Sequence, residues 1–504
     1  MLRRLDLTRP QIGDLVAGLS VVLALVPQGL AYAELAGMPG HIGLLAGTLP
    51  AILAAFFVSS PYLQTGPTAL TSLLVAGALT PLAAAQTDDY VLLGALLALM
   101  VGVARVVFGA LRLGIAAYFV SQPVLTGFTS GAALLIMGSQ LPTVAGYSSD
   151  SSRVLGRALA TLAHPGDWNW ASIMLAVITF VLIVTLRKVH QIFPSVLLGV
   201  AVSWAIAAIF DLDVATVGDI PSVGVSLVDE LPFDSTAHLI VPAIVIALIG
   251  FAEPSSIART YAAAQRQRWS ANAEFVSQGV ANLAAGAIGS YPVGGSFGRS
   301  SLNYRAGATT RWSGFITGVA MLVLLPFSNV LSSMPKSALA AVVISSVMSL
   351  FRLDRISAMW SWSRPQTAAA AVTLVATLAF DPRIERGILV GVALSVGIHL
   401  WRELQVYIEV ERTGDHLRIV PHGVLWFGSI NRISEKILAV IADHPDVDDV
   451  EIVLGGIGRL DLTAAFELAE LAADARKRPD LDLRFSGVPP HAERLFSRVI
   501  DTAE

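Results

Sequence analysis

The feature that most limits how this chain can fold is a break between two long apolar segments, at residues 291–301. Pro292 ends any helix that arrives from before it. Gly294 and Gly295 let the backbone bend and approach a ligand closely, and Gly298 does the same a few residues later. Serine and apolar residues then restart a helix. Because the first amides of a helix have no partner within it and its dipole makes that end positive, a helix that begins inside a bilayer is an anion site.

Arg299 lies in the first turn of this restarted helix and adds a full positive charge. An arginine at membrane depth is energetically costly and is usually functional. The alternative is a loop at the membrane surface that carries a solvated arginine. The stretch by itself leaves both interpretations open.

A second break occurs in the first half of the chain, at residues 64–70. Gly66 suits a turn, and Pro67 suits the first position of a helix. An earlier proline also interrupts an apolar segment in each half, Pro27 in one and Pro254 in the other, at nearly the same spacing from the break. Gly/Pro interruptions at corresponding places indicate a transporter built from inverted repeats, in which two half-helices point their N-termini at one site near the midplane.

The composition supports a membrane protein. The chain has 504 residues, of which 54% are hydrophobic and 14% are charged, whereas soluble domains carry about 25% charged residues. A polytopic membrane protein is therefore expected rather than a water-soluble enzyme. The net charge of -4 gives no reason to expect a nucleic-acid partner. The absence of cysteine excludes a disulfide framework, a thiol nucleophile and a thiolate metal site.

About fourteen apolar segments are expected between residues 14 and 402, and two of them are the short half-helices at about 68–80 and 298–308. The predicted fold is a polytopic α-helical membrane domain over 1–402. Its two halves cover about 12–210 and 236–402.

The two ends of the chain are expected on the cytoplasmic side of an inner or plasma membrane. The N-terminus is basic, with Arg3, Arg4 and Arg9, and positive charge favours the cytoplasmic side. An even number of crossings returns the chain to that side. From residue 403 to 504 charges become frequent, and strands such as 417–420 and 424–427 alternate with helical segments. This pattern predicts a small cytoplasmic α/β domain of about 100 residues.

Several long motifs resemble the sulfate permease (SulP) family, called solute carrier 26 in animals. They lie, in the family's order, at residues 14–19, 27–37, 121–131 and 278–303. The C-terminal part resembles the STAS domain that this family carries. The resemblance implies two inverted seven-segment repeats, with a core domain (segments 1–4 and 8–11) that moves against a gate domain (segments 5–7 and 12–14), and often a homodimer. Family members carry sulfate, bicarbonate, chloride, oxalate or dicarboxylates, some with protons or sodium.

The expected substrate site follows from the breaks and from the resemblance. Arg299 matches the family arginine at the start of the tenth segment, and we expect it to set the positive potential rather than to pair structurally. Thr68 and Ser296 could add hydroxyl groups. Gln28 and Tyr32 lie about one turn from each other, and they either hydrogen-bond an oxyanion or satisfy backbone groups freed by the proline. Backbone amides are the expected direct ligands, at Gly66, Thr68 and Ala69 on one side and at Gly295, Ser296, Phe297 and Gly298 on the other; Pro67 has none.

Two carboxylates are candidates for coupling transport to a cation. Glu253 matches a family acidic position, where it can bind sodium or a proton, unless it forms a permanent salt bridge with Arg299. Glu34 also resembles a family acidic position and is the first candidate for proton coupling, unless it is simply solvated at the membrane surface. Sodium is less favoured, because Ile257, one turn after Glu253, has no hydroxyl, and because Arg299 opposes a bound cation.

Other motifs argue against a cofactor or an enzyme. Residues 455–458 lack the spacing of a nucleotide-binding loop. The family's STAS signature Asp-Ser-Thr-Gly is replaced by Asp461, Leu462, Thr463 and Ala464, which places phosphorylation and nucleotide switching in doubt. No histidines have metal-ligand spacing. The sequence thus predicts a secondary active transporter that has no cofactor. Its expected partners are a small anion, a proton, the lipid bilayer and a second copy of the chain. The alternatives are a passive anion exchanger, a gated anion channel and a sodium-coupled bicarbonate transporter.

Overall fold

The computed structural model describes residues 9–114, 120–149, 151, 153–189, 192–220, 224–475, 477–478 and 481–503. Arg3 and Arg4 of the predicted basic start lie outside the described residues. The chain forms two compact units, Met1–Ala393 and Leu394–Glu504. The division lies within a helix, α17 (Glu385–Glu403), and precedes by nine residues the boundary at 402/403 that the sequence suggests.

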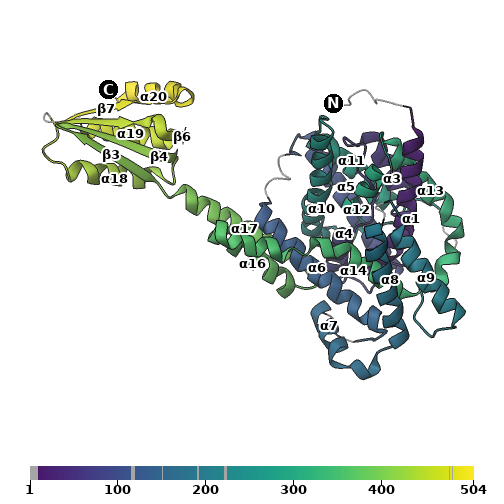
Figure 1. Cartoon of the computed structure of the whole chain (residues 1–504). Coiled ribbons are helices and arrows are strands. Elements are labelled where there is room, and N and C mark those ends of the chain that lie inside the picture. Colours follow the sequence, from purple (N-terminus) through teal and green to yellow (C-terminus); the bar gives the residue numbers. More distant parts are fainter. Residues whose placement is uncertain are drawn as a thin grey trace. The chain divides into compact units, whose positions relative to one another are not determined.

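The first unit is helical, and its elements can be followed in chain order in Figure 1. Eight of its described segments are long and apolar enough to cross a membrane. The first half contains α1 (Ile12–Leu35), α2 (Gly40–Leu45), α3 (Leu49–Phe57), β1 (Thr65–Gly66), α4 (Ala69–Leu79), α5 (Asp88–Ala110), α6 (Gln122–Ala145), α7 (Val154–Ala163), α8 (Trp170–Val189) and α9 (Ser195–Ile209). The second half contains α10 (Thr236–Ala264), α11 (Ala271–Ala287), β2 (Gly294–Gly295), α12 (Phe297–Arg305), α13 (Trp312–Leu324), α14 (Lys336–Val347), α15 (Leu353–Trp362), α16 (Arg364–Ala379) and α17.

These elements account for the fourteen predicted segments as two matching series of seven. The pair α2–α3 forms one segment, and each two-residue strand forms one with the half-helix after it, whereas α7 and α15 are extra connecting helices. The two half-helices are short, 11 residues in α4 and 9 in α12. The two strands that precede them pair antiparallel, with Thr65 opposite Gly295 and Gly66 opposite Gly294. Equivalent elements that meet in opposite directions are what inverted repeats require.

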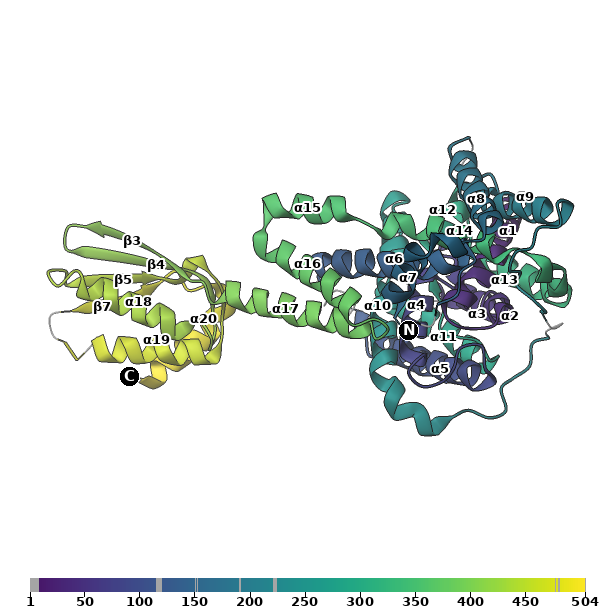
Figure 2. The same ribbon diagram turned by 90° about the horizontal axis from the view of Figure 1, so that it is seen from below.

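The contacts between the helices of this unit, which Figures 1 and 2 show from two sides, divide the helices into two groups. In one group, α11 lies against α5 and α3, α1 against α13, and α10 against α5. In the other, α6 lies against α16 and α14, and α8 lies against α9 and α14. Helix α1 also contacts α14 and α9 across the boundary. The first group corresponds to the core domain that the family resemblance implies, and the second corresponds to the gate domain.

The second unit is a small α/β domain, as predicted from residue 403 onward. Its strands are β3 (Tyr407–Thr413), β4 (His416–Leu425), β5 (Asp449–Val453), β6 (Ile457–Leu460) and β7 (Asp482–Ser486). The sheet order is β3-β4-β5-β7, with β6 beside β4. Strand β3 is antiparallel to β4 and the other pairs are parallel. The helices are α18 (Ile430–Ala442), α19 (Leu462–Ala475) and α20 (Pro490–Ala503).

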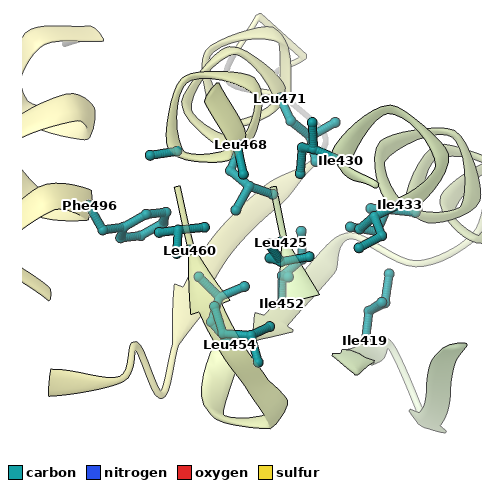
Figure 3. Packing of buried hydrophobic residues seen from close by; sticks show 14 of the residues in the cluster. Ile419, Leu425, Ile430, Ile433, Ile452, Leu454, Leu460, Leu468, Leu471 and Phe496 are labelled. Carbon is teal, nitrogen blue, oxygen red and sulfur yellow. The ribbon is translucent and has the colours of Figure 1, made fainter. Parts of the chain in front are cut away.

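The prediction of separate strands at 417–420 and 424–427 is wrong, because β4 runs through both Pro421 and Gly423. At Gly423 the register shifts, and β4 exchanges its parallel partner from β5 to β6. The sheet carries an apolar core shared with α18 and α19, in which Leu425, Ile433 and Ile452 are fully buried (Figure 3). The second unit thus has an apolar core of its own.

Candidate functional site

The two half-helices begin next to each other because the backbone around β1 and β2 is bonded beyond the two strands. The amide of Ser296 donates to the carbonyl of Gln64 at 3.0 Å. The amide of Gln64 in turn donates to the hydroxyl of Ser300 at 2.9 Å. Proline and glycine in both breaks prevent the preceding helices from continuing. Helices α4 and α12 therefore begin next to the place where β1 and β2 pair. The positive ends of two helices are thereby brought to one place.

A cavity of about 310 Å³ lies at these helix starts. Its walls come from α4 and α12, from α1 and α10 of the core group, and from α8, α9 and α14 of the gate group. Nine of the residues proposed from sequence line it: Gln28, Tyr32, Thr68, Ala69, Glu253, Ser296, Phe297, Gly298 and Arg299. Gly66, Gly295 and Glu34 do not line it.

Arg299 is buried to 1% exposure and faces this cavity. Its Nη1 donates to Oε1 of Gln28 at 3.3 Å. Its Nε and Nη2 have no hydrogen-bond partner among the described residues. Buried polar groups are nearly always bonded, and an unmatched buried charge is strongly unfavourable. Two free donors of a guanidinium beside a cavity therefore provide a ready site for an oxyanion.

Gly66 and Gly295, which do not line the cavity, allow the elements behind it to pack closely. A side chain at Gly66 would place its Cβ 3.3 Å from Nη2 of Arg299. A Cβ at Gly295 would lie 2.6 Å from Leu63 and 3.2 Å from the ring of Pro254. Gly298 differs, because nothing lies within 4 Å of the Cβ that it lacks. Gly66 and Gly295 thus permit close packing behind the cavity, while Gly298 leaves space in front of α12.

The two hydroxyl groups proposed as ligands have different surroundings. Thr68 caps α4, since its Oγ1 accepts from the amide of Thr71 at 3.3 Å and donates to the Thr71 hydroxyl at 3.0 Å. Ser296 occupies the equivalent cap of α12, but its side chain makes no capping bond. The Ser296 hydroxyl therefore remains available to a ligand, whereas that of Thr68 is already engaged.

Glu253 contacts the start of α12 directly. Its Oε1 accepts from the amide of Phe297 at 2.9 Å. None of the ion pairs found among the described residues joins Glu253 to Arg299, so the permanent salt bridge considered from sequence is not present. The carboxylate instead occupies a helix N-terminal amide, which is the kind of group that an anionic substrate would use.

Glu34 lies away from the cavity and pairs with Lys336. Its Oε1 is 2.8 Å from the Lys336 Nζ, and both side chains are partly buried, at 22% and 29% exposure. Glu34 is at the end of α1, whereas Lys336 is the first residue of α14. The ion pair therefore joins the two groups of helices, and Glu34 is more than a solvated surface residue.

Sequence reasoning missed several residues of the cavity wall. Arg187 at the end of α8 and Arg305 at the end of α12 both line it, although neither was among the candidate site residues. Ser345, Ser346 and Ser349 also line it, from α14 and the turn after it. Polar residues inside an apolar segment were the available signal for the serines. With three arginines and one glutamate among its lining residues, the cavity has an excess of positive charge.

Comparison with known proteins agrees with this architecture. A model of the sulfate permease family matches residues 12–373. "Sulfate transporter 4.1, chloroplastic" of Arabidopsis thaliana is 33% identical over 408 residues, which cover 79% of this chain and 59% of that protein. The "Sodium-independent sulfate anion transporter" of Bos taurus is 29% identical over 504 residues, covering 92% and 82%. Both relatives are named as transporters, not as enzymes.

Among solved structures, the murine Solute Carrier 26 family member A9 anion transporter, in the inward-facing state, aligns with a TM-score of 0.90 at 18% identity, covering 97% of this chain and 87% of that one. At this identity the match shows the fold alone. The family model covers more than half of the sequence, and the crossing of two half-helices fits it. The chain therefore belongs to the sulfate permease family.

Proposed function

We propose that the protein is a secondary active transporter of small anions, of the sulfate, bicarbonate or dicarboxylate class, which bind between the starts of α4 and α12. One observation carries this proposal: the guanidinium of Arg299 is buried at a cavity, and no described residue bonds two of its nitrogens. A bound anion would complete those bonds and offset the buried charge. The excess of arginine over carboxylate around the cavity favours the same ligand class.

The positions of the connections support alternating access. If the N-terminus is cytoplasmic, six crossings return the chain to the cytoplasmic side between α8 and α9. Phe193 and Pro194 of that connection line the cavity, which would then open to the cytoplasm. Glu34 follows the first crossing and Lys336 precedes the twelfth, so their ion pair would lie on the opposite, closed side. Opening that side requires α1 and α14 to separate and the ion pair to break.

This arrangement gives each carboxylate a means of coupling to protons. A proton on Glu34 removes its charge and weakens the attraction to Lys336, so the closed side opens more easily. A proton on Glu253 removes a negative charge from the amide of Phe297, where an anion would bind. We retain Glu34 as the first coupling candidate and Glu253 as the second.

Sodium coupling is less well supported. Ile257, one turn after Glu253, is fully buried and offers no oxygen ligand. Arg299 faces the same cavity as Glu253 and repels a cation. The bovine relative is named as sodium-independent. The names of both relatives favour sulfate as the first anion to test.

The proposal extends to the assembly through the family resemblance. The second unit would be a cytoplasmic STAS domain, and its mixed sheet flanked by helices fits a small α/β module. A homodimer in the inner or plasma membrane is the proposed working form. The altered residues 461–464 make a structural role of this unit more plausible than nucleotide switching.

The function can be tested with the purified full chain in liposomes. Labelled sulfate, bicarbonate and a dicarboxylate would be offered at two external pH values, with and without sodium, and Arg299→Ala would serve as the inactive control. We expect concentrative uptake of at least one anion that increases as external pH falls and does not depend on sodium. Uptake that only equilibrates would favour a passive exchanger or a channel, and uptake that requires sodium would favour the bicarbonate-transporter alternative.

A further inference from the structure

A second arginine, Arg105 of α5, is completely buried within the core group of helices. Within the part of the chain that the structure describes, its guanidinium is bonded only to backbone carbonyls. Nε donates to Ala247 at 3.2 Å and Nη2 to Ile246 at 3.1 Å, both in α10. Nη1 donates to Val293 at 2.9 Å. Because no ion pair found among the described residues includes Arg105, its positive charge has no neighbouring carboxylate to offset it.

Arg105 holds the backbone in place just before β2 and α12. Val293 directly precedes β2, and α12 follows β2 after one residue. The backbone of the same residue is also held by Asn282, whose Oδ1 accepts from the Val293 amide at 3.0 Å and whose Nδ2 donates to the Val293 carbonyl at 3.0 Å. The Val293 carbonyl therefore has two donors, one of them charged. These bonds fix the position from which α12 starts.

The guanidinium is also linked to the other half-helix, α4, through Gly250 of α10. A Cβ at Gly250 would be 2.7 Å from Nη2 of Arg105 and 3.6 Å from Oγ1 of Thr71. Thr71 in turn is bonded to Thr68, which lines the cavity. Gly250, Thr71 and Thr68 thus form a series of contacts from the guanidinium to the cavity wall. In such a buried, weakly screened setting a charge acts on a nearby ligand much more strongly than it would in water.

We propose that Arg105 is a positioning residue for anion binding, which holds the entry to β2 and α12 and whose unpaired charge makes the site prefer divalent over monovalent anions. This inference rests on the proposed function. The interaction of a fixed charge with a ligand doubles when the ligand charge doubles, so the loss factor for a divalent anion is the square of that for a monovalent one. If Arg105 only made structural hydrogen bonds in the core, its loss would weaken the binding of both anions by the same factor.

The test compares Arg105→Gln, Arg105→Lys and wild-type protein, all as the full chain in detergent or liposomes. Arg112→Gln is the matched control, because Arg112 follows the same helix but is exposed. Equilibrium binding would be measured for sulfate and for bicarbonate. Hydrogen–deuterium exchange of residues 291–297 would be followed without any anion, so this measurement does not depend on transport.

In Arg105→Gln, we expect bicarbonate to bind about threefold more weakly and sulfate about ninefold more weakly, with faster exchange at 291–297. Arg105→Lys retains the charge but cannot reproduce the three guanidinium hydrogen bonds. It should therefore keep the preference for sulfate, while residues 291–297 should still exchange faster than in wild type. Arg112→Gln should match wild type in every measurement. If Arg105→Gln does not fold, the exchange rate of Arg105→Lys decides.

Equal losses for the two anions in Arg105→Gln would contradict the electrostatic role, and wild-type exchange in Arg105→Lys would contradict the positioning role; either result overturns the proposal. Failure of the wild-type protein to bind any anion would instead count against the proposed function. The exchange measurement would remain decisive for Arg105 in that case.

Discussion

Oε1 of Glu253 accepts a hydrogen bond from the amide of Phe297 at 2.9 Å, so a carboxylate of α10 occupies the first amide of α12. Arg299, two residues further on, keeps two unbonded nitrogens in the same cavity. The carboxylate of Glu253 thus already occupies one hydrogen-bond donor of the site, the Phe297 amide, while two nitrogens of the Arg299 guanidinium bond no described residue. Substrate and Glu253 are expected to compete for the start of α12.

Substitution of Glu253 tests this competition. Glu253→Gln keeps an oxygen that can accept from Phe297 but removes the negative charge. We expect sulfate to bind at least about threefold more tightly at pH 8, since the repulsion between the carboxylate and the anion is lost. The difference from wild type should shrink at pH 5.5, where the wild-type carboxylate is more often protonated. Weaker binding at both pH values, measured by isothermal titration, would show that the carboxylate supports the site instead.

The glycines give a paired test of the geometry. In Gly66→Val, the side chain would collide with Arg299, whose Nη2 lies 3.3 Å from the position of the first added carbon. We therefore expect transport to be blocked. Gly295→Val should act similarly through Leu63 and Pro254. Gly298→Ala is the matched control for folding, because its methyl group enters open space; it should leave the protein stable and reduce uptake of bulky dicarboxylates more than that of sulfate. Normal uptake by both valine variants would place the site elsewhere.

Coupling should depend on Glu34. In Glu34→Gln, the charge that pairs with Lys336 is gone at every pH. We expect uptake in liposomes to lose its acceleration at low external pH while anion exchange persists. Lys336→Gln removes the same ion pair but leaves the titratable carboxylate, so some pH response should remain. A full wild-type pH response in Glu34→Gln would show that another group carries the proton.

The second unit offers a stability test that is separate from transport. Leu425 is fully buried in the core of the sheet domain. Leu425→Ala should lower its free energy of unfolding by about 2–5 kcal/mol, because the substitution leaves a cavity. Leu438→Ala is the control, since Leu438 is 52% exposed, and it should change stability by no more than about 0.5 kcal/mol. Chemical denaturation followed by the hydrogen–deuterium exchange of β5 would compare the two variants. Equal stability would contradict the packing of Figure 3.

Local sequence signals were sufficient to predict the two half-helices. Proline and glycine restrict or free the backbone by themselves, so the breaks at 64–70 and 291–301 could be recognised without knowledge of the rest of the fold. The same signals led to Arg299, because it directly follows a break. Strand β4 shows the converse, since Pro421 and Gly423 suggested a break that tertiary pairing with β3, β5 and β6 overrides.

Long-range contacts could not be predicted in the same way. The bond between Glu253 and Phe297 spans 44 positions, and the contact of Arg105 with Val293 spans 188. The ion pair of Glu34 joins helices from opposite halves of the chain. Such pairs depend on how the repeats meet, and a single sequence carries no direct signal of that arrangement. The serines of α14 are recognisable as polar residues in an apolar segment, but their contact with the cavity depends on how α14 packs.

The central claim is that Arg299 and the starts of α4 and α12 form the anion site. The most direct measurement is equilibrium binding of labelled sulfate to Arg299→Ala and to wild-type protein. Arg112→Ala is the control, because it removes an exposed arginine. Size-exclusion chromatography would first show that all three proteins are folded. The account predicts at least about a hundredfold weaker binding in Arg299→Ala, as expected when a buried charged partner of the ligand is lost, and no change in Arg112→Ala. Wild-type sulfate affinity in folded Arg299→Ala would contradict the account.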